Sequence, residues 1–122
     1  MVKLVNRAKM TTSTTGAGAI TLGSAETGFQ TFAAAGVVDG DLVRYVIEDG
    51  NAFEIGSGTY TASGTTLSRT VSESSNSDAA LNLSGSAKVF ISATAEDMAF
   101  VDEDYGLVTG VVGQLDDYGS VA

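Results

Sequence analysis

One stretch of alternating residues constrains the fold of this chain more than any other part of the sequence. In residues 42–48 (LVRYVIE), Val43, Tyr45 and Ile47 recur at every second position. That period places their side chains on one face of a β-strand. Asp-Gly-Asn follows at 49–51 and suits a tight turn, because Gly and Asn tolerate positive φ. With the returning segment 52–55, the sequence predicts an antiparallel hairpin.

Further short strands are expected on both sides of this hairpin. A second hairpin is predicted from 58–61 and 65–71 around the loop Ala-Ser-Gly at 62–64, and single strands at 17–22 and 88–94. The polar run SESSNSD at 72–78 is expected to be a surface loop. The side chains expected in the core are Val43, Tyr45, Ile47, Phe53, Ile55, Phe90 and Ile91.

These elements predict an all-β protein, a small antiparallel β-sandwich or barrel with an extended acidic C-terminal arm. No segment in 11–95 keeps a helical apolar period for more than a turn. The 15 glycines and the absence of proline agree with turn-rich β structure. We divide the chain into a basic N-terminal segment (1–10), a β domain (11–95) and the acidic arm (96–122).

The acidic arm contains an internal repeat. Asp-Tyr-Gly-Leu-Val at 104–108 recurs at 117–121 as Asp-Tyr-Gly-Ser-Val. Two copies are too few to build a solenoid with its own core. We therefore expect the arm to dock its apolar side chains on another subunit or partner, the alternative being a disordered acidic tail.

Charge is distributed unevenly along the chain. Residues 1–10 carry Lys3, Arg7 and Lys9 without an acid, whereas the last 27 residues carry seven acids and no base. The two ends therefore attract each other, within a chain or between copies. A net charge of −9 argues against nucleic acid as a partner. The charges near the N-terminus interrupt any signal-peptide core, and the longest run without a polar side chain, 32–38, is too short for a membrane span.

The composition removes most catalytic chemistry. Without His or Cys the chain cannot form a Ser-His-Asp or Cys-His site. Ser86 with Lys88, and the carboxylate pairs near residues 39–41 and 48–54, remain as remote catalytic candidates. Asp-Gly-Asp at 39–41 and Asp-Glu-Asp at 102–104 offer calcium ligands without the spacing of a known calcium loop. We expect no enzyme activity, no cofactor and no metal.

An ordered set of short motifs resembles a module that recurs in virion proteins of tailed bacteriophages. The resemblance covers residues 5–95, about three quarters of the chain. Its motifs are NRAKMTT (6–12), TTG (14–16), ITLG (20–23), GFQTF (28–32), RYVIEDG (44–50), FEIG (53–56), GTY (58–60), GTTLSR (64–69) and SSN (74–76).

The resemblance implies a structural role without catalysis. Such modules often lie at the virion-proximal end of tail fibres, so the expected function is a tail-fibre anchor or adaptor subunit that assembles in the host cytoplasm, as a homotrimer and with other virion proteins. A capsid decoration or cement protein is the alternative. The residues expected at protein interfaces are Lys3, Arg7, Lys9, Phe100, Tyr105, Leu107, Tyr118 and Val121.

A carbohydrate-binding β module is a further alternative. It would need an exposed aromatic platform, for which the candidates are Phe29, Phe32, Tyr45 and Tyr60. We expect Phe29 and Phe32 to pack into the core instead, and burial of all four candidates would exclude this alternative.

Overall fold

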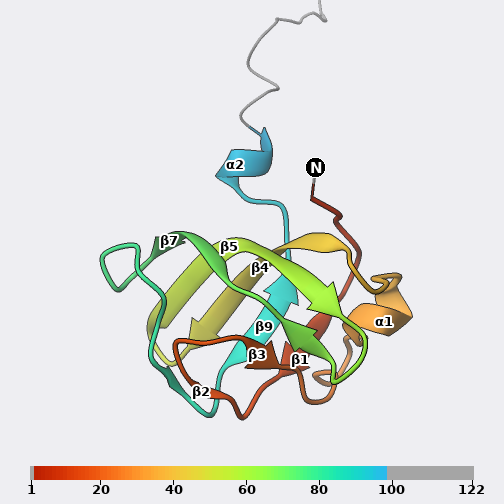
Figure 1. The fold of residues 1–122 in the computed structure, drawn as a ribbon, viewed down its shortest axis with the longest axis horizontal. Coiled ribbons are helices and arrows are strands. Elements are labelled where there is room, and N and C mark those ends of the chain that lie inside the picture. The colour runs from red at the N-terminus through yellow and green to blue at the C-terminus, as the bar shows by residue number, and fades with distance from the viewer. Residues whose placement is uncertain (1, 99–122) are drawn as a thin grey trace, which may run out of the picture. The chain divides into compact units, whose positions relative to one another are not determined.

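The computed structural model describes residues 2–98, which fall into two units divided after Ser92. The first unit contains nine strands and one short helix (Figure 1). The strands are β1 (Lys9–Thr11), β2 (Thr15–Gly16), β3 (Ile20–Thr21), β4 (Leu42–Asp49), β5 (Ala52–Thr61), β6 (Thr66–Leu67), β7 (Thr70–Ser74), β8 (Leu83–Ser84) and β9 (Lys88–Ile91). Helix α1 is Phe32–Ala35, and in the second unit the described part contains α2 (Ala95–Met98).

Seven of the strands form one curled antiparallel sheet. Their order is β1-β9-β4-β5-β6-β3, with β7 paired to β5, while β2 and β8 form a separate pair. The curl brings the two ends of the sheet together. This is seen from the Thr12 hydroxyl beside β1, which donates a 2.7 Å hydrogen bond to the Thr21 carbonyl of β3. The result is a half-barrel (Figure 1), which confirms the predicted all-β antiparallel fold.

The hairpin of β4 and β5 is the longest ladder and agrees with the sequence prediction. Its register runs from Leu42 opposite Thr59 to Asp49 opposite Ala52. The two-residue loop begins with Gly50 at φ +64°, the geometry that a type II′ turn needs at its first central position. This loop length fixes the register and therefore decides which side chains face inward.

The interior is filled by side chains from most of the strands and from α1. Val43, Tyr45 and Ile47 are completely buried, as predicted, and Ile91 of β9 is buried as well. Helix α1 contributes the buried Phe32 and begins at Thr31, whose hydroxyl accepts a hydrogen bond from the Ala34 N–H. Gly36, at φ +116°, ends this helix. The core therefore consists mainly of aliphatic and aromatic side chains from one face of the sheet.

The prediction of burial in the core is wrong for three residues. Phe53 is 37% exposed, and Ile55 and Phe90 are only half-buried. In an antiparallel pair, residues directly opposite each other project to the same face. Tyr45 lies opposite Gly56 and Ile47 opposite Glu54, so the inner face of β5 carries these two residues, and Phe53 and Ile55 face outward. A buried glutamate and glycines gave no apolar signal from which to predict this.

Strand boundaries also differ from the prediction. Of the strand expected at 17–22, only Ile20–Thr21 pairs, and the strand expected at 88–94 ends at Ile91. The expected loop 72–78 begins as strand, because β7 continues to Ser74 opposite Glu54. The second hairpin is present, with Thr61 opposite Thr66 around residues 62–65.

The basic N-terminal residues are part of the folded body. Strand β1 starts at Lys9 and pairs with β9, so the boundary expected after residue 10 falls inside a strand. Upstream, Lys3 forms a parallel bridge with Val43 of β4. These contacts join the first ten residues to the half-barrel.

Two glycines on the inner face of β5 allow the close packing of the half-barrel, and one of them gives a direct test. A Cβ at Gly56 would lie 2.2 Å from the Thr70 carbonyl oxygen and 2.6 Å from the Tyr45 hydroxyl. We expect Gly56→Ala to lower the free energy of unfolding by about 2 kcal/mol or more. The reason is that the backbone carbonyl of Thr70 cannot move away from the new methyl group as easily as a flexible side chain could. Urea denaturation followed by circular dichroism measures this.

Gly18→Ala is the matched control. Nothing lies within 4 Å of a Cβ at Gly18, so this variant should differ from the wild type by less than about 1 kcal/mol. Equal stability of the two variants would show that β5 is not packed as described.

Candidate functional site

The strongest electrostatic feature of the protein is an ion pair inside the half-barrel. Arg69, between β6 and β7, faces Glu54 of β5, and their side chains are 2% and 0% exposed. The Arg69 Nε–H donates to Glu54 Oε2 at 3.0 Å, and Nη2 donates to Oε1. The two groups thus form a bidentate pair, the strongest geometry between guanidinium and carboxylate.

Every donor of the guanidinium has a partner. Besides Glu54, Nη1 donates to the carbonyls of Gly16 and Gly18 at 3.2 and 3.0 Å, and Nη2 donates to the Leu81 carbonyl at 2.9 Å. A guanidinium has five N–H groups, and these contacts use all of them. Arg69 therefore joins the loop after β2, strand β5 and the segment before β8.

Glu54 is equally well satisfied. Its Oε2 accepts a 2.7 Å hydrogen bond from the Tyr45 hydroxyl, and its Oε1 accepts one of 2.8 Å from the Leu81 N–H. Burial alone would raise the pKa of Glu54, but the hydrogen bonds from Arg69, Leu81 and Tyr45 outweigh it and hold this pKa below its ordinary value. Burial lowers and the carboxylate raises the pKa of Arg69, and the net shift is upward.

This cluster, which we call the Arg69 node (Arg69, Glu54, Tyr45), has a structural role. Its lone pairs and donors are committed to one another and to the backbone, so it leaves no position for a substrate. The sequence did not reveal it, since Glu54 is one of several acids scattered along the chain. The available signal was its place directly opposite Ile47, a position whose side chain must point inward.

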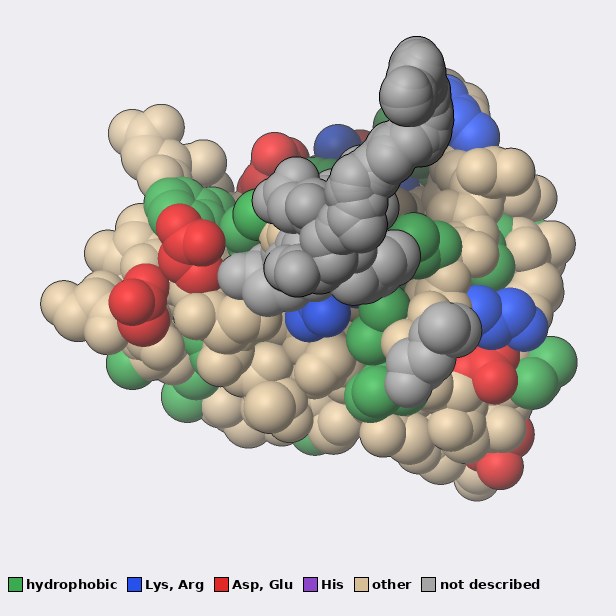
Figure 2. All heavy atoms as spheres, turned by 90° about the horizontal axis from the view of Figure 1, so that it is seen from above, with side chains coloured by type: hydrophobic (Ala, Val, Ile, Leu, Met, Phe, Trp, Pro, Cys, Tyr) green, Lys and Arg blue, Asp and Glu red, His purple; other side chains and the backbone are tan. Residues whose placement is uncertain are grey.

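The three predicted basic interface residues do not gather at one place. Lys3 donates to the Gly36 carbonyl at 2.7 Å and forms a 3.1 Å ion pair with Asp41. Hydrogen bonds to the Asp41 carboxylate from the Val38 N–H and from Lys3 lower the pKa of Asp41. The face in Figure 2 shows Lys and Arg side chains at several separate places.

Arg7 and Lys9 lie together with two aromatic rings. The Arg7 guanidinium carbon lies 3.9 Å from the centroid of the Phe29 ring, and the Lys9 ammonium lies 5.4 Å from Phe29 and 5.3 Å from Phe90. Such contacts stabilise a cation by about 0.5–1 kcal/mol at an exposed site. Arg7 also takes a positive φ of 56°, an uncommon conformation for a residue other than glycine. We call Arg7, Lys9, Phe29 and Phe90 the basic–aromatic cluster.

The other predicted interface residues lie outside the described residues. They are Phe100, Tyr105, Leu107, Tyr118 and Val121.

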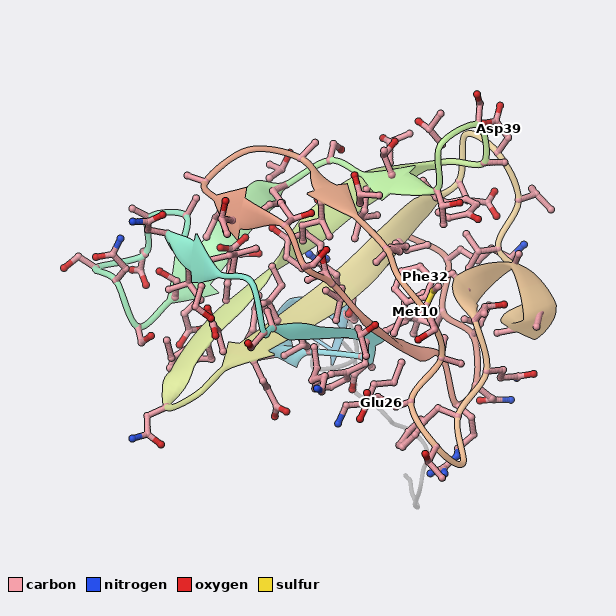
Figure 3. The ribbon with its side chains drawn as sticks, turned by 90° about the horizontal axis from the view of Figure 1, so that it is seen from below. Met10, Glu26, Phe32 and Asp39 are labelled. Carbon is pink, nitrogen blue, oxygen red and sulfur yellow. The ribbon has the colours of Figure 1, made fainter. Side chains whose placement is uncertain are left out.

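Of the catalytic and metal candidates, the acids at 102–104 lie outside the described residues, and others are engaged in structural contacts. Lys88 lies 3.7 Å from Glu26 in an ion pair, and Asp39 accepts a 3.0 Å hydrogen bond from the Ala62 N–H. Figure 3 shows Glu26 and Asp39 at opposite margins of the body, with Met10 and Phe32 between them. Among residues 2–98 no group of three acidic side chains could hold a metal ion.

The aromatic platform expected of a carbohydrate-binding module is not formed by the four candidates. Phe32 and Tyr45 are completely buried, and Tyr60 is nearly so. Phe29 is half-buried and belongs to the basic–aromatic cluster, so the expectation that both phenylalanines enter the core holds for Phe32 alone.

Comparison of the chain with models of known families, with curated proteins and with solved structures finds no match. Within the described part of the chain, no helix has both the length and the apolar character to cross a membrane.

The Arg69 node makes a prediction about stability. Glu54→Gln removes the charge that compensates a buried guanidinium, so we expect a loss of about 3–5 kcal/mol in the free energy of unfolding. The double variant Glu54→Gln/Arg69→Met removes both charges and should lose clearly less than the sum of the two single variants. Urea denaturation of all three variants measures the coupling, and additive losses would contradict it.

The same node predicts a pH dependence. Burial, and then the hydrogen bond to Glu54, raise the pKa of Tyr45 well above its ordinary value of 10.0. Below pH 10 the unfolded chain also keeps this proton, so the contribution of Tyr45 to stability is complete. Above pH 10 the unfolded chain releases it first, and stability falls by up to about 1.4 kcal/mol per pH unit.

Phenylalanine variants isolate this effect. Tyr45→Phe should lose the part of the alkaline dependence that comes from this hydroxyl, whereas Tyr60→Phe leaves the contact between Tyr45 and Glu54 intact and should keep it. Denaturation midpoints between pH 8 and pH 11 measure both. A Tyr45→Phe variant with the wild-type slope would show that the hydroxyl is not held as described.

Proposed function

We propose that this chain is a non-enzymatic structural protein of a tailed-bacteriophage virion, a tail-fibre anchor or adaptor subunit. The observation that carries the proposal is the ordered set of virion-module motifs over residues 5–95. A structural role also fits the chemistry of the body, in which the candidate catalytic groups are engaged in ion pairs and hydrogen bonds.

The geometry suits an assembly subunit. A virion subunit needs a body that keeps its shape while its surface is held by neighbours. The Arg69 node supplies rigidity, because the Arg69 side chain binds backbone carbonyls of two segments distant in sequence and the carboxylate of Glu54 in a third. The basic–aromatic cluster supplies a surface with both charge and apolar area, a combination that is common in protein interfaces.

A capsid decoration protein is the alternative within the same class, since a small rigid β body serves equally well on a head. The carbohydrate-binding alternative has less support, because three of its four platform residues are buried.

Immunogold labelling of purified virions of the phage that encodes the chain tests the proposal. Label confined to the tail is the expected result. Label spread over the head would replace the anchor or adaptor with a decoration protein. Intact particles without label would contradict a surface virion role.

The proposed homotrimer has its own test. Light scattering after size-exclusion chromatography should give a mass three times the 12.4 kDa of one chain. A mass that stays at that of one chain up to high micromolar concentration would contradict self-assembly.

A further inference from the structure

The edge of β4 that faces β9 is covered by two different segments. Strand β9 covers its second half, with residue pairs over 45–48 of β4. Near the start of β4 the edge is covered instead by residues 2–5, which we call the strap. Lys3 forms a parallel bridge with Val43, and the Lys3 N–H donates a 2.7 Å hydrogen bond to the Leu42 carbonyl.

One residue supplies the polar contacts of the strap. Within the described part of the chain, every hydrogen bond and ion pair of the strap involves Lys3. Its ammonium donates to the Gly36 carbonyl at 2.7 Å and lies 3.1 Å from the Asp41 carboxylate. Leu4 is 45% exposed, and Val5 adds a partly buried contact with the core. A segment with so few contacts opens at a smaller free-energy cost than the whole fold.

The chain is held firmly directly after the strap. The Gln30 side chain donates a 2.8 Å hydrogen bond to the Asn6 carbonyl, and the Gln30 N–H donates one of 2.7 Å to the Arg7 carbonyl. An opening of the strap therefore ends at Asn6 and leaves β1 in place.

We propose that the start of β4 is a strand-accepting site for a partner protein, and that the strap blocks this site in the free chain. Opening of the strap leaves the Leu42 carbonyl without its donor and the Asp41 carboxylate without its cation. A strand edge with unpaired backbone groups accepts an extended segment of another protein, which restores the missing hydrogen bonds.

The strap itself shows the chemistry that the site selects. Its sequence, Val-Lys-Leu-Val, has aliphatic residues on both sides of one lysine. The ammonium binds a carbonyl and a carboxylate, so the site favours a lysine at this position of the partner. The expected ligand is therefore an extended segment, parallel to β4, in which aliphatic residues flank a lysine.

Apolar side chains that the strap leaves uncovered favour a different protein over a second copy of this chain. Val38, whose N–H donates to the Asp41 carboxylate, is 59% exposed, and Leu42 is 39% exposed. The strap of a second copy would make only the contacts that the chain's own strap already makes, without the advantage of a tether. A partner segment with a larger apolar surface covers Val38 and Leu42 as well, and can therefore displace the strap.

Peptide titration of two full-length chains tests the proposal. The probe is the tetrapeptide Val-Lys-Leu-Val, acetylated and amidated at its ends, and the amide NMR signals of Gly36, Val38 and Leu42 report its binding. Lys3→Glu unlocks the strap, because it places a negative charge against Asp41 and leaves the accepting site unchanged. We expect this variant to bind the peptide at least tenfold more tightly than the wild type, in which the strap competes.

Two controls isolate the site. Lys88→Glu disrupts an ion pair with Glu26, outside the strap and the accepting site, and should bind the peptide as weakly as the wild type. A peptide with glutamate in place of its lysine should bind the Lys3→Glu chain at least tenfold more weakly than the original peptide.

Several outcomes would overturn the proposal. A Lys3→Glu chain that binds no peptide, or that binds both peptides equally, would show that the start of β4 is not such a site. Equal affinity of the Lys3→Glu and wild-type chains would show that the strap does not block it. So would an amide of residue 3 that exchanges with deuterium as slowly in the variant as in the wild type. A larger mass of the unlocked chain in light scattering would place a second copy in the site.

Discussion

The buried pair of Arg69 and Glu54 is the interaction on which the rest of this structure depends. A guanidinium is costly to remove from water, and here the cost is offset by five hydrogen bonds, two of which form the bidentate pair with the Glu54 carboxylate. Those bonds hold the loop after β2 and the segment at Leu81 against β5. Strands β2 and β8, which lie in these parts of the chain, pair with each other in a small sheet of their own, and the node supplies contacts that join this part to β5.

The node also explains why the half-barrel can be built from such short strands. Glu54 takes the position where an aliphatic side chain would face Ile47, and Gly56 leaves the space that the Tyr45 ring occupies. The aromatic ring and the carboxylate then meet through the tyrosine hydroxyl. The packing of the inner face and the hydrogen bonding of its buried polar groups thus depend on the same residues.

The sequence predicted the fold class, the β4–β5 hairpin and the inward face of β4, because a period of two and a Gly-containing turn are local signals. It did not predict which face of β5 is buried. That choice depends on the register with β4, which the two-residue loop at 50–51 sets and the three-residue turn predicted at 49–51 shifts by one, and on a partner for Glu54 located fifteen residues away. The sequence therefore predicts Phe53, Ile55 and Phe90 in the core, whereas the structure places them on the outer face of the sheet. The sequence predicts Lys9 at an interface. It does not predict the rings of Phe29 and Phe90 beside Lys9, because these residues are distant from it in the sequence.

A reconstruction of the purified virion by cryo-electron microscopy, at side-chain resolution, tests the central claim most directly. The account predicts half-barrels at the tail, each with Arg69 and Glu54 paired inside it. A particle without the half-barrel at its tail, or a half-barrel in which Arg69 and Glu54 lie apart, would contradict it.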